Sequence, residues 1–467
     1  MRSLKNHTVL LLALGAIAVA MPSCKKKEGC TDPTASNYDP DADKDCCCEY
    51  APTPSNVIQV QGSITSNTTW SNTNKYLLMG FVYVEDGATL TIQPGTIIKG
   101  DKPTKGSLIV KRGGKILADG TASQPIVFTS NQAAGSRDRG DWGGIIICGR
   151  APHNQPSDPT VEGGPDAIYG GTNADDNSGI LRYVRIEFAG IAFQPNQEIN
   201  GLTLGAVGSG TTIEHVQVSY SGDDSYEWFG GNVNAKYLIA HRGLDDDFDQ
   251  DFGWQGHVQF AVSLRDPNYA DASGSNGFEC DNDAAGNSTA PYSQGTWSNV
   301  TVLGPLTVSS TISDLYKRAA HLRRNTQTRI YNSVFAGYAT GLLIDGGTTE
   351  TNATNGDLQF RNSILAGIST TPLAVASGST WDITTWFNTA GWNNTILANN
   401  SDLGIALPTI LTGPQLRPET GSPILAGAAF TGPLADSFYE QVSYRGAFGG
   451  TDWTSGWANW DPQNTAY

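Results

Sequence analysis

Acidic residues crowd one short stretch of the 467-residue chain. Asp223 and Asp245 are 22 residues apart, as are Asp224 and Asp246. In a repeating fold, a shared offset of 22 corresponds to one turn of chain, which places the two pairs on neighbouring strands about 5 Å apart. Carboxylates so close raise one another's pKa unless a cation lies between them, and oxygen ligands favour Ca²⁺ over zinc. Glu227 lies on the same edge, and the predicted metal ligands are Asp223, Asp224, Asp245, Asp246, Asp247, Asp249 and Asp251.

Three interpretations of this acidic cluster stay open from the residues alone. The first is a structural Ca²⁺ site or an Asx-rich turn that stabilises the chain locally. The second is a carbohydrate-binding groove, in which Trp228 and Trp254 would provide an aromatic platform. The third is catalysis, with paired carboxylates acting as acid and base, as in glycoside hydrolysis. The candidate catalytic residues are Asp223, Asp224, Asp245, Asp246, Arg242 and Arg265.

Two further groups of charged residues follow. The acids of residues 276–283 (NGFECDND) alternate along a predicted strand and therefore share one face, as a second metal site or a solvated surface. A basic patch contains Arg323, which is 78 residues after Asp245. That separation predicts about three turns of chain, roughly 14 Å, between the two residues. Arg242 and Arg265 are therefore the nearer candidates for an arginine at the cluster.

The chain that positions these residues alternates short apolar strands with Gly, Asn and Pro turns from residue 56 onwards. Only 16% of the residues are charged, which disfavours long solvent-facing helices. Four strand units carry Asn at a fixed place, 33, 30 and 32 residues apart. This unequal but persistent period is typical of a solenoid with loops of variable length, in which the Asn amides would stack as a ladder. The four are Asn299, Asn332, Asn362 and Asn394.

Two long segments carry a family resemblance. GTTIEHVQVSYSGDDSYEWFGG (residues 210–231) and KYLIAHRGLDDDFDQDFGW (residues 236–254) resemble a group of Bacteroidota surface lipoproteins. The strand units resemble the right-handed parallel β-helix of the pectin-lyase-like superfamily. The resemblance implies an all-β, right-handed, single-stranded parallel β-helix solenoid over residues 56–440. Residues 441–467 are then a Trp-rich C-terminal cap, expected to cover the open edge of the last coil.

The same resemblance bears on activity. Pectate lyases of this fold hold Ca²⁺ with acidic residues on stacked coils and use an arginine as base, and β-helix glycosidases use clustered Asp as acid and base. Fold alone does not fix function, because one architecture hosts unrelated activities. Catalysis therefore stays an alternative to binding.

The N-terminal residues predict export and anchoring. The apolar run at residues 9–20 follows two cations and is too short to span a bilayer, as in a signal peptide. It ends at residues 21–24 (MPSC), which resemble the bacterial lipobox. This resemblance implies a signal peptide at residues 1–23 and lipidation of Cys24. The predicted location is the outer membrane, at the cell surface or on the periplasmic face, with the membrane as a partner through this anchor.

Residues 24–55 form a lipidated Cys- and Asp-rich tether, a short module too small for a core of its own. Export places its cysteines where disulfides persist, and we predict one between Cys30 and Cys48. The connectivity of the adjacent cysteines at 46–48 stays open. The alternating Asp residues of 39–45 fit either a Ca²⁺ site or a solvated acidic spacer. The two remaining cysteines lie in apolar runs and are predicted to be buried thiols: Cys148 and Cys280.

Composition excludes two classes of partner. The net charge of −16 excludes unaided binding to nucleic-acid phosphates. No Walker loop or Rossmann fingerprint is present, so no nucleotide is expected. The sequence predicts a lipid-anchored cell-envelope β-helix protein that binds polysaccharide or another surface macromolecule, such as a surface protein, with structural Ca²⁺. The alternatives are a polysaccharide lyase or glycoside hydrolase of the pectin-lyase-like fold and a purely structural envelope protein.

Overall fold

The computed structural model of the protein describes residues 26–33, 35, 37–48, 56–194, 197–406 and 410–467. They belong to two compact units, one within residues 1–55 and one spanning 56–467, and each is described by itself.

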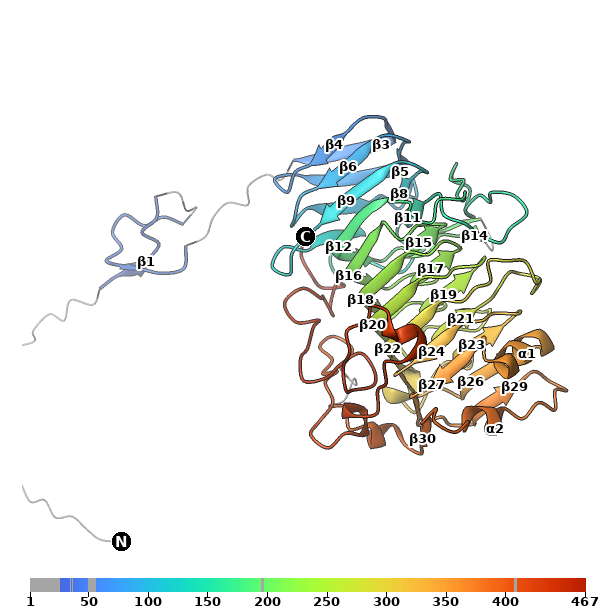
Figure 1. The fold of residues 1–467 in the computed structure, drawn as a ribbon. Coiled ribbons are helices and arrows are strands. Elements are labelled where there is room, and N and C mark those ends of the chain that lie inside the picture. The colour runs from blue at the N-terminus through green and yellow to red at the C-terminus, as the bar shows by residue number, and fades with distance from the viewer. Residues whose placement is uncertain (1–25, 34, 36, 49–55, 195–196, 407–409) are drawn as a thin grey trace, which may run out of the picture. The chain divides into compact units, whose positions relative to one another are not determined.

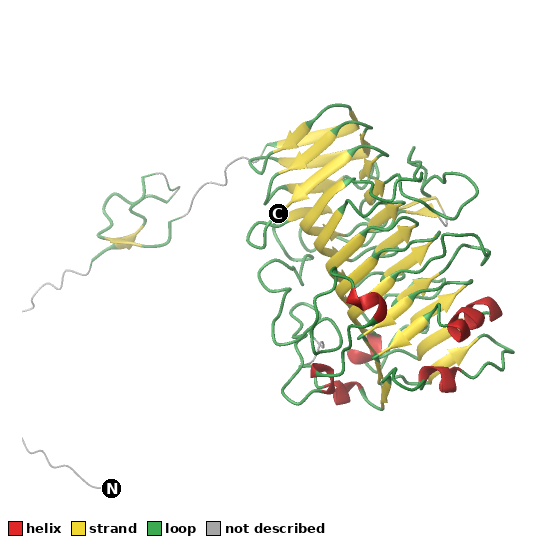
Figure 2. Ribbon diagram, in the orientation of Figure 1, coloured by secondary structure: helices red, strands yellow, loops and turns green. Residues whose placement is uncertain are grey.

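The larger unit is a β-helix. Twenty-six strands join into one continuous parallel sheet, which runs from β3 and β4 at one end to β29 and β30 at the other (Figure 1). Figure 2 shows that its few short helices lie outside the wound sheet. Because parallel strands need crossovers, each strand pairs with the strand one coil away rather than with its neighbour in sequence. The predicted all-β parallel β-helix is confirmed.

The coils contribute strands to three faces of the β-helix, here called A, B and C. Face A contains β4 (Thr68–Trp70), β6 (Thr89–Ile92), β9 (Lys115–Asp119), β24 (Arg329–Tyr331) and β27 (Gln359–Arg361). Face B contains β7 (Ile97–Gly100), β10 (Ile126–Ser130), β25 (Val334–Ala336), β28 (Ile364–Ala366) and β30 (Thr395–Leu397). Five long strands bend from face A to face B: β12 (Gly179–Glu187), β16 (Thr212–Ser219), β18 (Asn234–His241), β20 (His257–Leu264) and β22 (Thr296–Leu303).

Face C carries the residues of chemical interest. Two strands, β3 (Val57–Ile64) and β5 (Lys75–Val84), bend from face B into it. The rest of face C is β8 (Ser107–Val110), β11 (Gly144–Cys148), β15 (Leu202–Gly205), β17 (Tyr226–Phe229), β19 (Phe248–Asp251), β21 (Phe278–Cys280), β23 (Arg318–Arg323), β26 (Thr340–Asp345) and β29 (Thr371–Val375).

The remaining elements lie in the connections between strands. A small antiparallel hairpin pairs β13 (Ala192–Gln194) with β14 (Gln197–Glu198). The α-helices are α1 (Gly347–Asn355) and α2 (Ile383–Phe387), and the 3₁₀ turns are η1 (Pro305–Thr307), η2 (Asn400–Leu403), η3 (Pro423–Leu425) and η4 (Gly432–Ala435).

A column of residues with left-handed backbone forms the corner between faces A and B. In the five long strands these residues have φ between 49° and 60°, and the first four carry rings. The ring centroids of Tyr183 and His215 are 4.4 Å apart, those of His215 and Tyr237 also 4.4 Å, and those of Tyr237 and Phe260 5.1 Å. Stacking of rings on successive coils offsets the cost of a conformation that most L residues avoid.

Asparagines continue this column in the later coils, because Asn tolerates the left-handed region better than most residues. Asn299, Asn332 and Asn362 stack as predicted, but the fourth member is Asn393, with φ of 50°, rather than Asn394. The expected amide ladder is confirmed only in part: Nδ2 of Asn332 donates to Oγ of Ser298 on the neighbouring coil at 3.0 Å, but other amide bonds leave the column. The Nδ2 atom of Asn299 donates to the carbonyl oxygen of Tyr444 at 2.8 Å, so the column bonds to a distant part of the chain.

That distant part is the return segment, residues 423–467, which runs back along the β-helix after β30 (Figure 1). Trp453 and Trp457 pack edge-on against His215, at centroid distances of 6.4 and 5.6 Å. The hydroxyl of Tyr467 donates to Oε1 of Glu187 at 2.6 Å. The expectation of a cap over the last coil is therefore wrong, because these aromatic residues pack along the column of corner rings instead.

The smaller unit is held by local bonds. Strands β1 (Glu28–Gly29) and β2 (Lys44–Asp45) pair in parallel. Cys30 and Cys48 form the predicted disulfide, and Cys46 is bonded to Cys47. Cys24 lies outside the described residues. In the described parts of the chain, no helix is long and apolar enough to cross a membrane.

Candidate functional site

Alternation along the strands of face C creates a row of outward-facing polar residues. Strand register places Glu227 beside Asp249, Asp249 beside Glu279, and Glu279 beside His321 on four successive coils. The residues on either side of each acid are buried: Tyr226 and Trp228, Phe248 and Gln250, and Phe278 and Cys280. Because side chains in a strand alternate between its two faces, an acid between two core residues must point outward.

The turns that precede these strands add further carboxylates to the row. They come from Asp223 and Asp224 before β17 and from Asp245 and Asp246 before β19. Two adjoining clefts result, with volumes of about 540 and 210 Å³. The larger cleft and the smaller one share Asp224, Asp245 and Asp249 in their walls. Together they are the acidic cleft, and nine carboxylates line it: Glu162, Asp223, Asp224, Glu227, Asp245, Asp246, Asp249, Asp271 and Glu279.

Three sets of carboxylates in the acidic cleft converge closely enough to share an ion. Within each set, one oxygen of every residue lies within 4.8 Å of the others. Neighbouring sets share one residue, Asp224 in one case and Asp249 in the other. The sets are Asp223, Asp224 and Asp245; Asp224, Glu227 and Asp249; and Asp246, Asp249 and Glu279.

Two buried asparagines face the same carboxylates. Nδ2 of Asn200 donates to Glu227, and Nδ2 of Asn276 donates to Oδ2 of Asp246 at 3.3 Å and to Oε2 of Glu279 at 3.2 Å. Both side chains are 1% exposed, and neither Oδ1 accepts a hydrogen bond from any residue that the structure describes. A buried acceptor without a donor is costly. Carboxylate and amide oxygens together are the donor set that Ca²⁺ prefers, so the residues present fit this ion.

Burial and mutual repulsion shift the acidity of the cleft. Burial, followed by the charges of Asp223 and Asp249, raises the pKa of Asp224 well above its usual range. Burial also raises the pKa of Asp245 to about 6, and the charge of Asp271 adds to this shift. A cation among these groups would favour their ionised forms and offset the repulsion.

Glu279 differs from its neighbours. Burial raises its pKa, but the hydrogen bond with His321 and the charges of Arg323 and Arg324 outweigh it, so the net pKa is lowered. His321 lies between two carboxylates, with Nδ1 3.4 Å from Glu279 and Nε2 2.9 Å from Oδ2 of Asp345. Arg323 and Arg318 line the smaller cleft together with its acids, so this cleft has both acidic and basic lining residues.

Two of the predicted metal ligands do not reach the carboxylate sets. Asp247 is fully buried and pairs with Arg265, whose Nε lies 3.2 Å from its Oδ2. Asp251 lies one outward position further along β19, beside Phe229, and accepts a hydrogen bond from the main-chain nitrogen of Phe252 at 2.7 Å. The prediction of these two residues as ligands is therefore wrong, whereas the other five lie together as expected.

Both predicted arginine candidates have other roles. Arg265 is fully buried and donates to the carbonyl oxygens of Gly243 at 3.2 Å and Asn276 at 2.9 Å, so it braces the turns from behind. Arg242 pairs with Asp266 and lines a different cleft. Neither guanidinium lines the acidic cleft, and the prediction of these two as catalytic candidates is wrong.

The predicted aromatic platform is wrong as well. Trp228 and Trp254 are fully buried and pack on each other at a centroid distance of 5.2 Å, with Trp297 beside both. The reason is alternation: Glu227 points outward from β17, so Trp228 must point into the core.

The basic residues that do line the acidic cleft come from β23. Arg318 and Arg323 are part of the wall of the smaller cleft, and Arg323 pairs with Glu279 and with Oδ1 of Asp281, the latter at 2.8 Å. The predicted separation of three coils between Asp245 and Arg323 is wrong. Two coils separate them, because β19 pairs with β21 and β21 pairs with β23. The long loops on either side of β22 add residues to the second coil without adding a third coil.

Glu279 belongs to the same outward row, although the 22-residue offset did not place it with the acidic residues 223–251. A repeated pattern could have located it: an aromatic residue followed by an acid opens the outward row in Tyr226-Glu227, Phe248-Asp249 and Phe278-Glu279. Asn200 and Asn276 carry no comparable signal, because only the register of the coils places them beside carboxylates.

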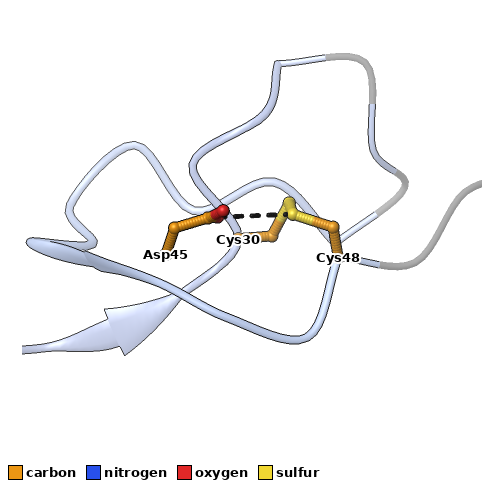
Figure 3. Close-up of side chains that lie close together, drawn as sticks. All are labelled: Cys30, Asp45 and Cys48. Carbon is orange, nitrogen blue, oxygen red and sulfur yellow. Dashed lines mark hydrogen bonds between the residues drawn. A yellow bond between two sulfur atoms is a disulfide. The ribbon is translucent and has the colours of Figure 1, made fainter.

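The N-terminal module offers no comparable site in its described residues. The one group of possible ligands there is Cys30, Asp45 and Cys48, whose two sulfurs are joined in a disulfide. Figure 3 shows Oδ1 of Asp45 facing Sγ of Cys48, at 3.5 Å. Asp39 instead pairs with Lys27 at 2.7 Å. The Ca²⁺ site and the acidic spacer at residues 39–45 both stay predictions.

Comparison with known proteins agrees with this architecture. The sequence model of the family described as pectate-lyase-like beta helix domain matches residues 62–412. No curated protein matches the chain. Among solved structures, the crystal structure of the Dettilon tailspike protein is similar, with 11% identity and a TM-score of 0.25. That alignment covers 69% of this chain and 62% of the tailspike chain, less than two thirds of the latter's length.

Proposed function

The chain belongs to the family of pectate-lyase-like β-helix domains, and from this premise we propose that it is a cell-envelope protein that binds polysaccharide at a Ca²⁺-loaded acidic cleft. The observation that carries the proposal is the convergence of three carboxylate sets on one face of the solenoid, each within 4.8 Å. In a chain whose charged fraction is only 16%, such a concentration costs stability unless a ligand offsets it.

The residues that would hold the ion are those of the three sets. Asp224 and Asp249 are shared between sets, and the amide oxygens of Asn200 and Asn276 are buried acceptors beside them. When bound, Ca²⁺ supplies positive charge that attracts sugar hydroxyl or carboxylate oxygens to an otherwise anionic surface. The chain's own contribution is rigidity, because β17, β19 and β21 are locked by parallel hydrogen bonds to their neighbours.

The decisive experiment incubates the full chain with a panel of acidic and neutral polysaccharides, with Ca²⁺ or with EDTA. Retention of a polysaccharide without cleavage, dependent on Ca²⁺, supports binding. Ca²⁺ alone should raise the melting temperature, since a ligand at about 100 times its Kd stabilises the folded state by about 2.7 kcal/mol. Absence of both retention and a Ca²⁺-dependent shift would falsify the proposal.

A matched pair of variants assigns the effect to the cleft. Asp245→Asn combined with Asp246→Asn removes two charges from the carboxylate sets and should abolish the thermal shift. Asp314→Asn, at an exposed acid outside the cleft, should keep it. Equal shifts in both proteins would assign the cation to another site.

A lyase or hydrolase is the second candidate, and one observation favours it. Arg318 and Arg323 line the smaller cleft together with Asp245, Asp246 and Glu279, so acidic and basic groups meet in one cavity. The same polysaccharide panel tests it: new reducing ends or unsaturated uronides would identify an enzyme. If nothing is retained and nothing is cleaved, a purely structural envelope role is left.

The anchoring of the protein is part of the proposal. The lipobox-like residues 21–24 support lipidation at Cys24 and placement at the outer membrane, on the cell surface or the periplasmic face. The resemblance of residues 210–231 to Bacteroidota surface lipoproteins supports the same placement.

A further inference from the structure

A second cleft, of about 300 Å³, lies between the β-helix and the return segment. Its walls combine arginine, tyrosine and amide side chains rather than a row of acids. The residues that matter to its chemistry are Arg137, Arg139, Tyr220, Arg242, Tyr269 and Asn464.

Among the described residues, no carboxylate forms an ion pair with Arg139. Its Nε and Nη2 atoms donate to the main-chain oxygen of Arg242, at 3.1 and 2.8 Å, and none of the described ion pairs includes it. The guanidinium carbon lies 4.0 Å from the ring centroid of Tyr269 and 5.0 Å from that of Tyr220. Stacking between two rings leaves the edge of the guanidinium plane for a ligand.

A second guanidinium lies close to the first. The guanidinium carbon of Arg242 is 4.7 Å from the ring centroid of Tyr220, and its side chain pairs with Asp266. Burial lowers the pKa of Arg139, the carboxylate of Asp266 opposes this, and the charge of Arg242 lowers it further. The positive charges of Arg139 and Arg242 are thus offset by the single carboxylate of Asp266, and a bound anion would reduce the repulsion between the two guanidinium groups.

The other carboxylates of this cleft are already bonded to neutral donors. Both oxygens of Asp461 accept from Nδ2 of Asn464, at 2.9 and 3.0 Å. Oδ1 of Asp138 accepts from the main-chain nitrogen of Arg139 at 2.8 Å, and this side chain is exposed to water. The guanidinium of Arg137 is bonded to the carbonyl oxygens of Pro462 and Thr465, at 2.6 and 2.9 Å, which ties the return segment to this wall.

We propose that this cleft is an oxyanion-binding site, which receives the carboxylate or sulfate group of a sugar through Arg139 and Arg242. The planar guanidinium of Arg139 matches two oxygens of such a group, as in bidentate arginine pairs. Tyr269 is 45% exposed and offers its ring to the sugar that carries the anion.

The site is separate from the acidic cleft, but neighbouring residues of one loop contribute to both. This loop supplies Tyr269 to this cleft, with Asp266 behind it as the partner of Arg242, and Asp271 and Ser273 to the acidic cleft. A charged glycan that occupied both would present its anionic groups to the arginines and to Ca²⁺. Oxyanion binding itself needs no cation, so the two proposals fail independently.

The test is calorimetric titration of the full chain in EDTA with sodium sulfate and, separately, with sodium glucuronate, at constant ionic strength set by chloride. Saturable binding of either anion supports the site, and the anion that binds more tightly identifies the preferred group. The Arg139→Gln protein should bind at least about tenfold more weakly, since one charge-assisted pair is lost.

Two further variants keep the test decisive. Arg150→Gln removes an arginine whose partner is the exposed Asp86, outside this cleft, and should bind as the parent protein does. Tyr269→Leu leaves both arginines in place and should weaken glucuronate by several-fold while sulfate changes little, and it is informative even if Arg139→Gln fails to fold. Absence of saturable binding, or equal binding by Arg139→Gln and Arg150→Gln, would overturn the inference.

Discussion

His241 shows how burial alone sets the charge of a single residue. Its side chain is fully buried, edge-on to the rings of Tyr220 and Trp460, and its Nε2 lies 3.0 Å from the carbonyl oxygen of Leu411. Burial, followed by the charge of Arg242, lowers the pKa of His241 to about 3. The imidazole is therefore neutral in the folded protein at neutral and mildly acidic pH.

This neutral histidine predicts a pH effect on stability. Below pH 6.5 the unfolded chain protonates His241 while the folded chain does not. The free energy of unfolding therefore decreases as pH falls from 6.5 towards 3. The expected slope is about 1.4 kcal/mol per pH unit. His241→Gln keeps a donor for Leu411 without a titrating group, and should flatten the fall in the free energy of unfolding measured by denaturant between pH 6.5 and 4. Parallel curves for the two proteins would contradict the prediction.

At the scale of the element, the return segment stabilises faces that a simple solenoid would leave bare. Trp457 is 2% exposed and belongs to an apolar cluster with Ile239 and Val262 on the outside of face B. Its Nε1 donates to the carbonyl oxygen of Trp453 at 2.7 Å. The segment therefore behaves as a packed layer and not as a tail.

Loss of that ring should loosen the whole layer. Trp457→Ala is expected to cost about 3–5 kcal/mol, the usual range for a buried aromatic residue, and to expose residues 423–467 to proteases. Thermal unfolding and limited proteolysis measure both effects, with Trp457→Phe as a control that keeps most of the apolar contact. A Trp457→Ala protein with an unchanged melting temperature and cleavage pattern would show that the layer is dispensable.

Sequence patterns predicted the strands and their coil positions better than the contacts that individual side chains make. The offset of 22 between Asp223 and Asp245 holds because that coil has no insertion, and it correctly brought four carboxylates together: Asp223, Asp224, Asp245 and Asp246. Counting failed for Arg323, since long loops add residues without adding a coil. Trp228 was assigned to the wrong face, although its neighbour Glu227 already determined it through strand alternation. No local pattern could show that the return segment would meet His215, because that contact joins residues more than 200 positions apart.

At the scale of the whole molecule, the anchor predicted at Cys24 decides where the clefts act. Cys24→Ser removes the only thiol in the lipobox-like motif, so the protein should move from the membrane fraction to the soluble fraction. Fractionation followed by immunodetection measures the change. Cys148→Ser, at a buried thiol of the β-helix, is the matched control and should stay with the membrane. Membrane retention of the Cys24→Ser protein would show that another feature holds it there.

The return segment also constrains the order in which the molecule is built. Coils of a solenoid contact their nearest neighbours and stack in the order of synthesis. Tyr467, however, bonds to Glu187 across 280 residues, and Arg137 bonds to Pro462 across 325. A chain emerging from its N-terminus therefore winds its coils while the apolar outside of face B is still uncovered, and in that interval it is open to aggregation. A surface formed early in synthesis is thus covered only after residues 423–467 have been made.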